Sequence, residues 1–215
     1  MPVRKIPIGN RAVTGLHARS GERYESSLER DFFELMMADS QVVDVEGQPV
    51  KINYTNAQGK RRRYTPDALV KFKPDALTGK VRSPLLCEVK YRAEFREKFL
   101  EMKDSIRAAR KYARAKGWQF RVVTDREIRT VRFANLRFLA GFRDRNPEAK
   151  HVHLILDKLK NTDPATPAVL LSALTSDVWV QAEMIPALWW LITHSKINAD
   201  LSVPITMQSP LSLAA

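Results

Sequence analysis

The chain is poor in several features that would assign it to a secreted or membrane class. Its 215 residues contain a single cysteine, Cys87, which cannot form an internal disulfide and is typical of a protein kept in a reducing cytosol. The longest uncharged apolar run, residues 184–192, falls far short of the ~20 residues that span a bilayer. The first residues contain no apolar stretch of the kind found in signal peptides. We therefore expect a cytoplasmic protein with no membrane partner.

Basic residues are abundant and unevenly placed. The chain has 36 Lys and Arg against 24 Asp and Glu, a formal net charge of +12. Residues 146–215 have a net charge of −2, so residues 1–145 carry +14. This excess of basic residues favours a polyanionic partner, such as a nucleic acid, for the N-terminal two-thirds of the chain. Binding is favourable because each phosphate that Lys or Arg neutralises releases counterions. A merely solubilising basic surface is the alternative interpretation.

Composition and apolar periodicity divide the chain into a basic N-terminal arm (1–22) and two domains (23–145 and 146–215). The first domain alternates predicted strands and helices, which is typical of an α/β domain with a mixed sheet. In the second domain, the sequence predicts three helices and two short strands around prolines, which is the outline of a winged helix. The third of these helices could be broken at Pro186. The expected helices lie at 26–39, 93–116 and 133–143, then 146–159, 166–174 and 177–194, and the expected strands at 42–45, 50–54, 68–72, 85–91 and 120–124.

Charged residues lie on two neighbouring predicted strands of the first domain. Asp67 begins one strand, and Glu88 and Lys90 lie in the next, where alternation places both on the same face. Two carboxylates and a lysine on one face are costly unless a cation lies between them, and hard oxygen ligands favour Mg²⁺ or Mn²⁺. This is the Pro-Asp…Glu-x-Lys arrangement of metal-dependent nucleases, in which the metal activates water and the lysine stabilises developing charge. The alternative interpretation of this motif is a surface hairpin with alternating charges and no catalytic role.

Four segments resemble, in order, the pattern of the TnsA family. They are Ser26-x-Leu28-Glu29-Arg-Asp-Phe, Tyr64-Thr-Pro-Asp67, Cys87-Glu88-Val-Lys90 and Gly117-Trp-x-Phe-x-Val-Val-Thr-Asp-x-Glu-Ile128. TnsA is the endonuclease subunit of heteromeric cut-and-paste transposases, including those of CRISPR-associated transposons. The resemblance covers about residues 10–140 closely and residues 146–215 in length and outline. It implies a restriction-endonuclease-like (PD-(D/E)xK) fold and an endodeoxyribonuclease that cuts the 5′ strand at each transposon end.

The resemblance also implies which residues form the site. The family's catalytic acids and lysine fall on Glu29, Asp67, Glu88 and Lys90, with the three acids as ligands of Mg²⁺ or Mn²⁺. Some family members have glutamine where this chain has Glu88, so the resemblance does not fix the ligand set. For Glu29, residue chemistry alone favours another role, as the acid of a capping box begun by Ser26. Beside the site, a basic stretch is expected to contact DNA phosphates: Lys60, Arg61, Arg62 and Arg63.

The partners implied by the resemblance are transposon-end DNA, the DDE transposase TnsB and the AAA+ ATPase TnsC, in a bacterial cytoplasm. No Lys or Arg lies between Val178 and Ser195, so we expect residues 146–215 to dock a protein rather than DNA. Three tryptophans of this segment are expected to be core residues, with an interface anchor as the alternative for one of them: Trp179, Trp189 and Trp190. Two alternatives stay open: a stand-alone restriction-like or junction-resolving nuclease, and a non-catalytic DNA-binding or scaffolding subunit.

Overall fold

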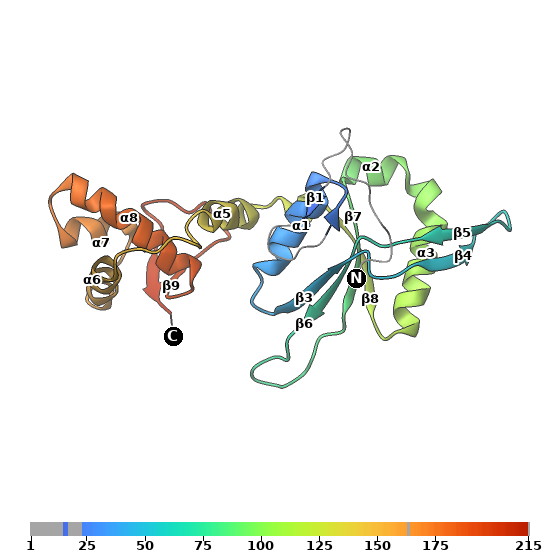
Figure 1. Ribbon diagram of the computed structural model, residues 1–215, viewed down its shortest axis with the longest axis horizontal. Coiled ribbons are helices and arrows are strands. Elements are labelled where there is room, and N and C mark those ends of the chain that lie inside the picture. The colour runs from blue at the N-terminus through green and yellow to red at the C-terminus, as the bar shows by residue number, and fades with distance from the viewer. Residues whose placement is uncertain (1–14, 17–22, 163, 215) are drawn as a thin grey trace. The chain divides into compact units, whose positions relative to one another are not determined.

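A computed structural model of the chain describes residues 15–16, 23–162 and 164–214 (Figure 1). It divides into two compact units between Arg129 and Thr130. Most of the predicted basic arm lies outside the described residues. Within it, β1 (Gly15–Leu16) pairs antiparallel with β2 (Arg23–Tyr24). No helix in the described part of the chain is both long and apolar enough to cross a membrane.

The first unit is built on a four-stranded mixed sheet, as the sequence predicts. Its strands, in spatial order, are β3 (Val42–Gly47), β6 (Ala68–Phe72), β7 (Leu85–Lys90) and β8 (Gln119–Thr124). Strand β6 runs antiparallel to both β3 and β7, whereas β7 and β8 run parallel. The parallel pair requires a crossover, which the helical segment between β7 and β8 supplies.

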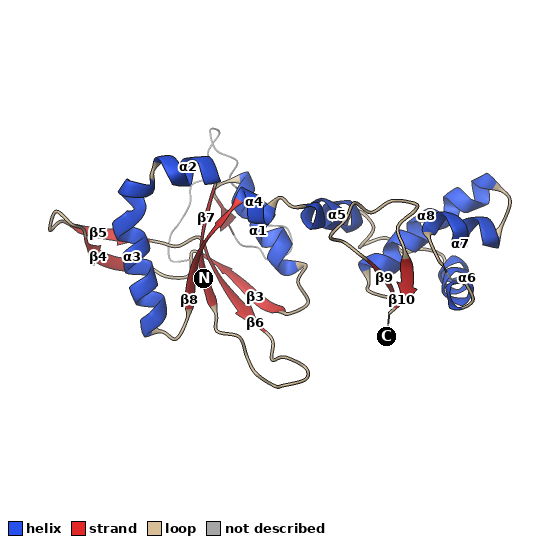
Figure 2. Cartoon of the chain, turned by 180° about the vertical axis from the view of Figure 1, so that it is seen from behind, coloured by secondary structure: helices blue, strands red, loops and turns tan. Residues whose placement is uncertain are grey.

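Helices cover both faces of this sheet (Figures 1 and 2). They are α1 (Ser27–Met37), α2 (Arg92–Glu97), α3 (Phe99–Ala115) and α4 (Asp125–Ile128). Phe32 of α1 is buried with Val70 and Val89 on one face of the sheet. On the other face, Ala109 of α3 is buried with Leu86. Because side chains alternate along β7, this arrangement places Glu88 and Lys90 on the face of Leu86.

The helix predicted over residues 93–116 is in fact two helices. Helix α2 ends at Glu97, and Lys98 adopts φ −95° and ψ 11° before α3 begins. The apolar spacing continues through this break, which is why the sequence suggests one helix. Apolar residues recur at positions 95, 99, 102, 106, 109 and 113, but only the last three are buried, whereas Phe99 is 44% exposed.

A separate two-stranded sheet lies beside α3 (Figure 2). Strand β4 (Ile52–Thr55) pairs antiparallel with β5 (Arg61–Tyr64). Ile52, opposite Tyr64 in the register, is buried against α3. Asn56 closes the turn by accepting hydrogen bonds from the amides of residues 58 and 60. The basic stretch of the sequence is therefore a strand rather than a loop, and Arg61, Arg62 and Arg63 are all exposed.

The second unit contains the predicted helices and short strands in the predicted order. They are α5 (Val131–Ala140), α6 (Ala149–Lys160), α7 (Pro167–Leu174), α8 (Val178–Thr193), β9 (Ile197–Ala199) and β10 (Leu211–Leu213). Strands β9 and β10 pair antiparallel. Ile155, Leu170 and Leu191 belong to the core that joins α6, α7 and α8. The winged-helix assignment of this unit stays a prediction.

Three details of the second unit differ from the expectations. The domain boundary falls after Arg129 rather than after residue 145, because α5 packs with this unit. Asn135 of α5 donates to the carbonyls of Leu201 and Val203, at 2.9 and 2.7 Å. Helix α8 runs through Pro186 without a break, at the cost of one backbone hydrogen bond. Trp189 is buried as expected, but Trp179 is 79% exposed.

Candidate active site

Asp67 is held against the neighbouring strand by two hydrogen bonds. Its backbone amide donates to the carbonyl oxygen of Cys87 at 3.0 Å. Its carboxylate oxygen Oδ2 accepts from the amide of Val89 at 2.7 Å. The side chain is only 14% exposed. The residue before β6 is thus fixed beside the segment of β7 that carries Glu88 and Lys90.

The structure brings together the three residues of the predicted nuclease motif. Nζ of Lys90 lies 3.4 Å from Oε1 of Glu88 and 4.0 Å from Oδ2 of Asp67. Cys87 and Val89 point to the opposite face and are buried in the core under α1. The alternation of charged and apolar residues in β7 therefore separates a core face from a chemical face, as the sequence predicts.

Glu29 lies in the first turn of α1, where the side chain of Ser26 caps the helix, which is one half of the expected capping box. The returning bond differs, because the Glu29 carboxylate accepts from the amide of Glu25 rather than from that of Ser26. The amide of Glu29 donates to Oγ of Ser26 at 3.1 Å, and the Ser26 hydroxyl donates back to Oε1 at 3.0 Å. Its other oxygen, Oε2, accepts from the amide of Glu25 at 2.8 Å. Burial, and then the nearby charge of Asp67, raise the pKa of Glu29 to about 7. Glu29 is therefore both part of the helix cap and a member of the acidic group.

The electrostatics of the group follow from burying several acids with one base. Burial, and then the charge of Glu88, raise the pKa of Asp67 to about 8. Burial raises the pKa of Glu88 as well, although the charge of Lys90 opposes this. Burial alone would lower the pKa of Lys90, but the charges of Asp67 and Glu88 raise it above its ordinary value. Three buried acids and one lysine leave a deficit of positive charge.

This deficit and the oxygen-only donor set fit a magnesium or manganese ion. Such an ion is commonly held by one or two carboxylates, with water and substrate phosphate completing the shell. Asp67 and Glu88, which both lie within 4.0 Å of Nζ of Lys90, could hold such an ion. Among the residues that the structure describes, no three acidic, histidine or cysteine side chains gather as a full set of metal ligands. The role of Glu29 as a third ligand stays a prediction.

Two residues that the sequence analysis did not assign contact the site. The hydroxyl of Tyr64 donates to Oε2 of Glu88 at 2.5 Å. Gln48 has φ 49°, donates from its backbone to the carbonyl oxygen of Asp67, and donates from its side chain to Oε1 of Glu25 at 3.1 Å. Tyr64 lies within a segment that carries the family resemblance, so a signal existed for it. Nothing in the sequence singles out Gln48.

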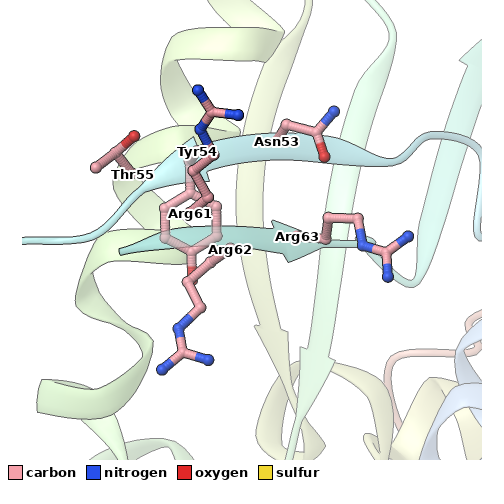
Figure 3. Close-up of a pocket in the computed structure, with 6 residues that line it drawn as sticks. All are labelled: Asn53, Tyr54, Thr55, Arg61, Arg62 and Arg63. Atoms are coloured by element: carbon pink, nitrogen blue, oxygen red, sulfur yellow. The ribbon is translucent and has the colours of Figure 1, made fainter. Parts of the chain in front are cut away.

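The exposed arginines of β5 line a cavity of about 580 Å³ on the β4–β5 sheet (Figure 3). The other lining residues are Asn53, Tyr54 and Thr55, and no acidic side chain is among them. The guanidinium groups extend away from the strand in Figure 3. Lys60 lies at the turn and does not line the cavity. The predicted DNA-contacting residues thus share one hairpin, and the next residue of its second strand is Tyr64.

A family model described as the N-terminal domain of TnsA-like endonucleases matches residues 39–125. The matched range includes Asp67, Glu88 and Lys90 and begins after Glu29. No curated protein matches the chain. The match confirms the resemblance found in the sequence.

Proposed function

We propose that this chain, whose residues 39–125 match the N-terminal domain of TnsA-like endonucleases, is the endodeoxyribonuclease subunit of a heteromeric transposase of the TnsA family. In this proposal it requires Mg²⁺ or Mn²⁺ and cuts the 5′ strand at each transposon end during cut-and-paste transposition. The observation that carries the proposal is the approach of Lys90 to both Asp67 and Glu88 within a strongly basic unit.

Each residue of the site has a chemical task in this proposal. Asp67 and Glu88 would hold the divalent ion, which when bound polarises the scissile phosphate and favours ionisation of a water. Lys90 directs its ammonium group at the same space and stabilises the charge that develops on phosphate oxygens. Glu29, whose pKa is raised to about 7, is suited to exchanging a proton with water near neutral pH.

The basic hairpin would position the DNA. Arg61, Arg62 and Arg63 are exposed and line one cavity, so they can contact phosphates of the backbone. Such contacts set the register of a protein on the duplex without reading its sequence. The +14 net charge of residues 1–145 would add a long-range attraction to the same partner.

The second unit would bind a protein partner. Helix α8 carries no Lys or Arg, which makes phosphate contact by this helix electrostatically poor. At its start, Val178 is 67% exposed and Trp179 is 79% exposed, and large aromatic side chains are frequent anchors of protein interfaces. By the family resemblance, the partner would be the AAA+ regulator TnsC, with the transposase TnsB as a second candidate.

End cleavage with the presumed partner transposase tests the proposal. The two strands of a transposon-end DNA carry different labels, and the protein is assayed with and without Mg²⁺. We expect a cut in the 5′ strand that requires both the partner and the metal, and none with Asp67→Ala. Cutting without a partner would favour a stand-alone nuclease. Normal cutting by Asp67→Ala would remove Asp67 from the site.

A further inference from the structure

The carboxylate of Glu88 is held from both sides by different groups. Its Oε2 accepts the hydrogen bond from the hydroxyl of Tyr64 at 2.5 Å, and its Oε1 faces Nζ of Lys90 at 3.4 Å. Glu88 is only 4% exposed, so little water is available to replace either contact. A carboxylate with one oxygen tied down cannot rotate freely. The tyrosine therefore fixes the orientation in which the carboxylate faces Lys90.

Tyr64 belongs to the strand that carries the exposed arginines. It is the last residue of β5, and Arg61, Arg62 and Arg63 are the residues before it. The β4–β5 sheet has no ladder hydrogen bonds to the four-stranded sheet in the described part of the chain. Instead, Tyr64 and Ile52 of this sheet pack in the apolar cluster that contains Leu86 and residues of α3. The hydroxyl of Tyr64 is thus a direct polar link from this hairpin to the acidic site.

Resting on the proposed function, we propose that Tyr64 is a positioning residue that couples the DNA-contacting hairpin to Glu88. The arginines hold the phosphate backbone, and the next side chain of the same strand orients the carboxylate that acts on it. Substrate binding and the arrangement of the site are then mechanically connected. Tyr64 itself does not touch the reacting atoms, and its contribution is the orientation of Glu88.

The decisive variant is Tyr64→Phe, which removes one oxygen and keeps the ring that packs beside Ile52. Cleavage of transposon-end DNA with the partner transposase should show a maximal rate at least ten-fold lower, with KM for DNA unchanged. Duplex-DNA affinity, measured by fluorescence anisotropy in the presence of a chelator, should also stay unchanged because the arginines are intact. Titration calorimetry of the DNA-free protein should show several-fold weaker Mn²⁺ binding.

Tyr91→Phe provides the matched control. Its hydroxyl shares a hydrogen bond of 3.2 Å with the Ser27 hydroxyl of α1, so the same kind of bond is lost in the same unit. We expect this variant to cleave and to bind Mn²⁺ within two-fold of the unchanged protein. A Tyr91→Phe loss equal to that of Tyr64→Phe would mean that the effect reports general stability, and it would overturn the proposal.

A double-mutant cycle separates an effect that Tyr64 exerts through Glu88 from a general loss of stability. Glutamine at position 88 keeps an amide oxygen for the phenol but removes the charge. Because Tyr64 acts through residue 88, the loss in Mn²⁺-binding free energy of the double variant should be clearly smaller than the sum of the losses from Tyr64→Phe and Glu88→Gln. Full additivity, or a Tyr64→Phe effect on DNA affinity instead of rate, would contradict the proposal. If the unchanged protein cuts no DNA with any partner, the Mn²⁺ cycle still decides the role of Tyr64, so the two failures are distinguishable.

Discussion

Replacing Asp67 with asparagine removes one negative charge from a buried acidic group while keeping the shape of the side chain. An amide oxygen can still accept the hydrogen bond from the amide of Val89, which the carboxylate accepts at 2.7 Å. The substitution therefore isolates the effect of the charge. We expect the metal-free variant to be more stable than the unchanged protein at pH 8, and inactive in cleavage.

The magnitude follows from the pKa of Asp67, which is raised from 3.8 to about 8 by burial and by Glu88. An acid whose pKa is higher in the folded than in the unfolded state lowers the free energy of unfolding as pH rises. The loss accumulates between the pKa of the unfolded state and that of the folded state. At about 1.36 kcal/mol per pH unit, this window amounts to roughly 5 kcal/mol at pH 8. Allowing for solvent relaxation and the 14% exposure leaves about 2–3 kcal/mol. Losing the partner of Lys90 costs about 1 kcal/mol.

The expected net gain of Asp67→Asn is therefore about 1–2 kcal/mol at pH 8 and close to zero at pH 5. Urea denaturation with a chelator present, combined with hydrogen exchange of the β7 amides, measures the stability of the first unit. Adding Mg²⁺ should stabilise the unchanged protein but not the variant. A variant less stable than the unchanged protein at pH 8, or equally stabilised at pH 5, would refute the reasoning.

The other predictions test separate parts of the chain. Lys90→Ala should keep Mn²⁺ and DNA binding but lose roughly 100-fold in cleavage rate, and calorimetry showing lost metal affinity would assign the lysine differently. Alanine at the arginines 61–63 should flatten the logarithmic salt dependence of duplex binding by about 0.9 per lost phosphate contact, whereas an unchanged slope would mean that they are merely solvated. Truncation after Arg129 should leave metal binding and weak DNA binding but stop transposition. Pull-downs in which residues 130–215 capture neither TnsB nor TnsC, but bind end DNA tightly, would reverse the role of the second unit.

Local pattern was sufficient for the elements that carry the chemistry. Strand β7 alternates buried apolar and charged residues, and its motif therefore indicated both the strand and the face on which Glu88 and Lys90 lie. The N-cap of α1 likewise depends only on neighbours in sequence, and in the structure the amide of Glu29 donates to Oγ of Ser26. Such features could be predicted because residues within four positions determine them.

Features that depend on distant contacts could not be predicted. Strand β5 lacks an apolar alternation and is a strand because β4 pairs with it, with Tyr54 opposite Arg62. The domain boundary depends on Asn135, whose side-chain oxygen accepts from the amide of Ile205 far along the chain. The sequence marks Trp179 as a large apolar residue but does not show whether another element covers it, so its exposure could not be told from burial.

The two interpretations of Glu29, as part of a helix cap and as a site acid, are compatible because its amide and its carboxylate take different partners. The amide donates to Oγ of Ser26, the N-cap of α1. The amide of Glu25 and the hydroxyl of Ser26 each donate to one oxygen of the carboxylate. This pair fixes the side chain of a residue that is only 6% exposed and lies close enough to Asp67 to raise its pKa. Each carboxylate oxygen keeps a further lone pair for water or a cation. The start of α1 thus supplies a preoriented acid near Asp67, which directly precedes the interior strand β6.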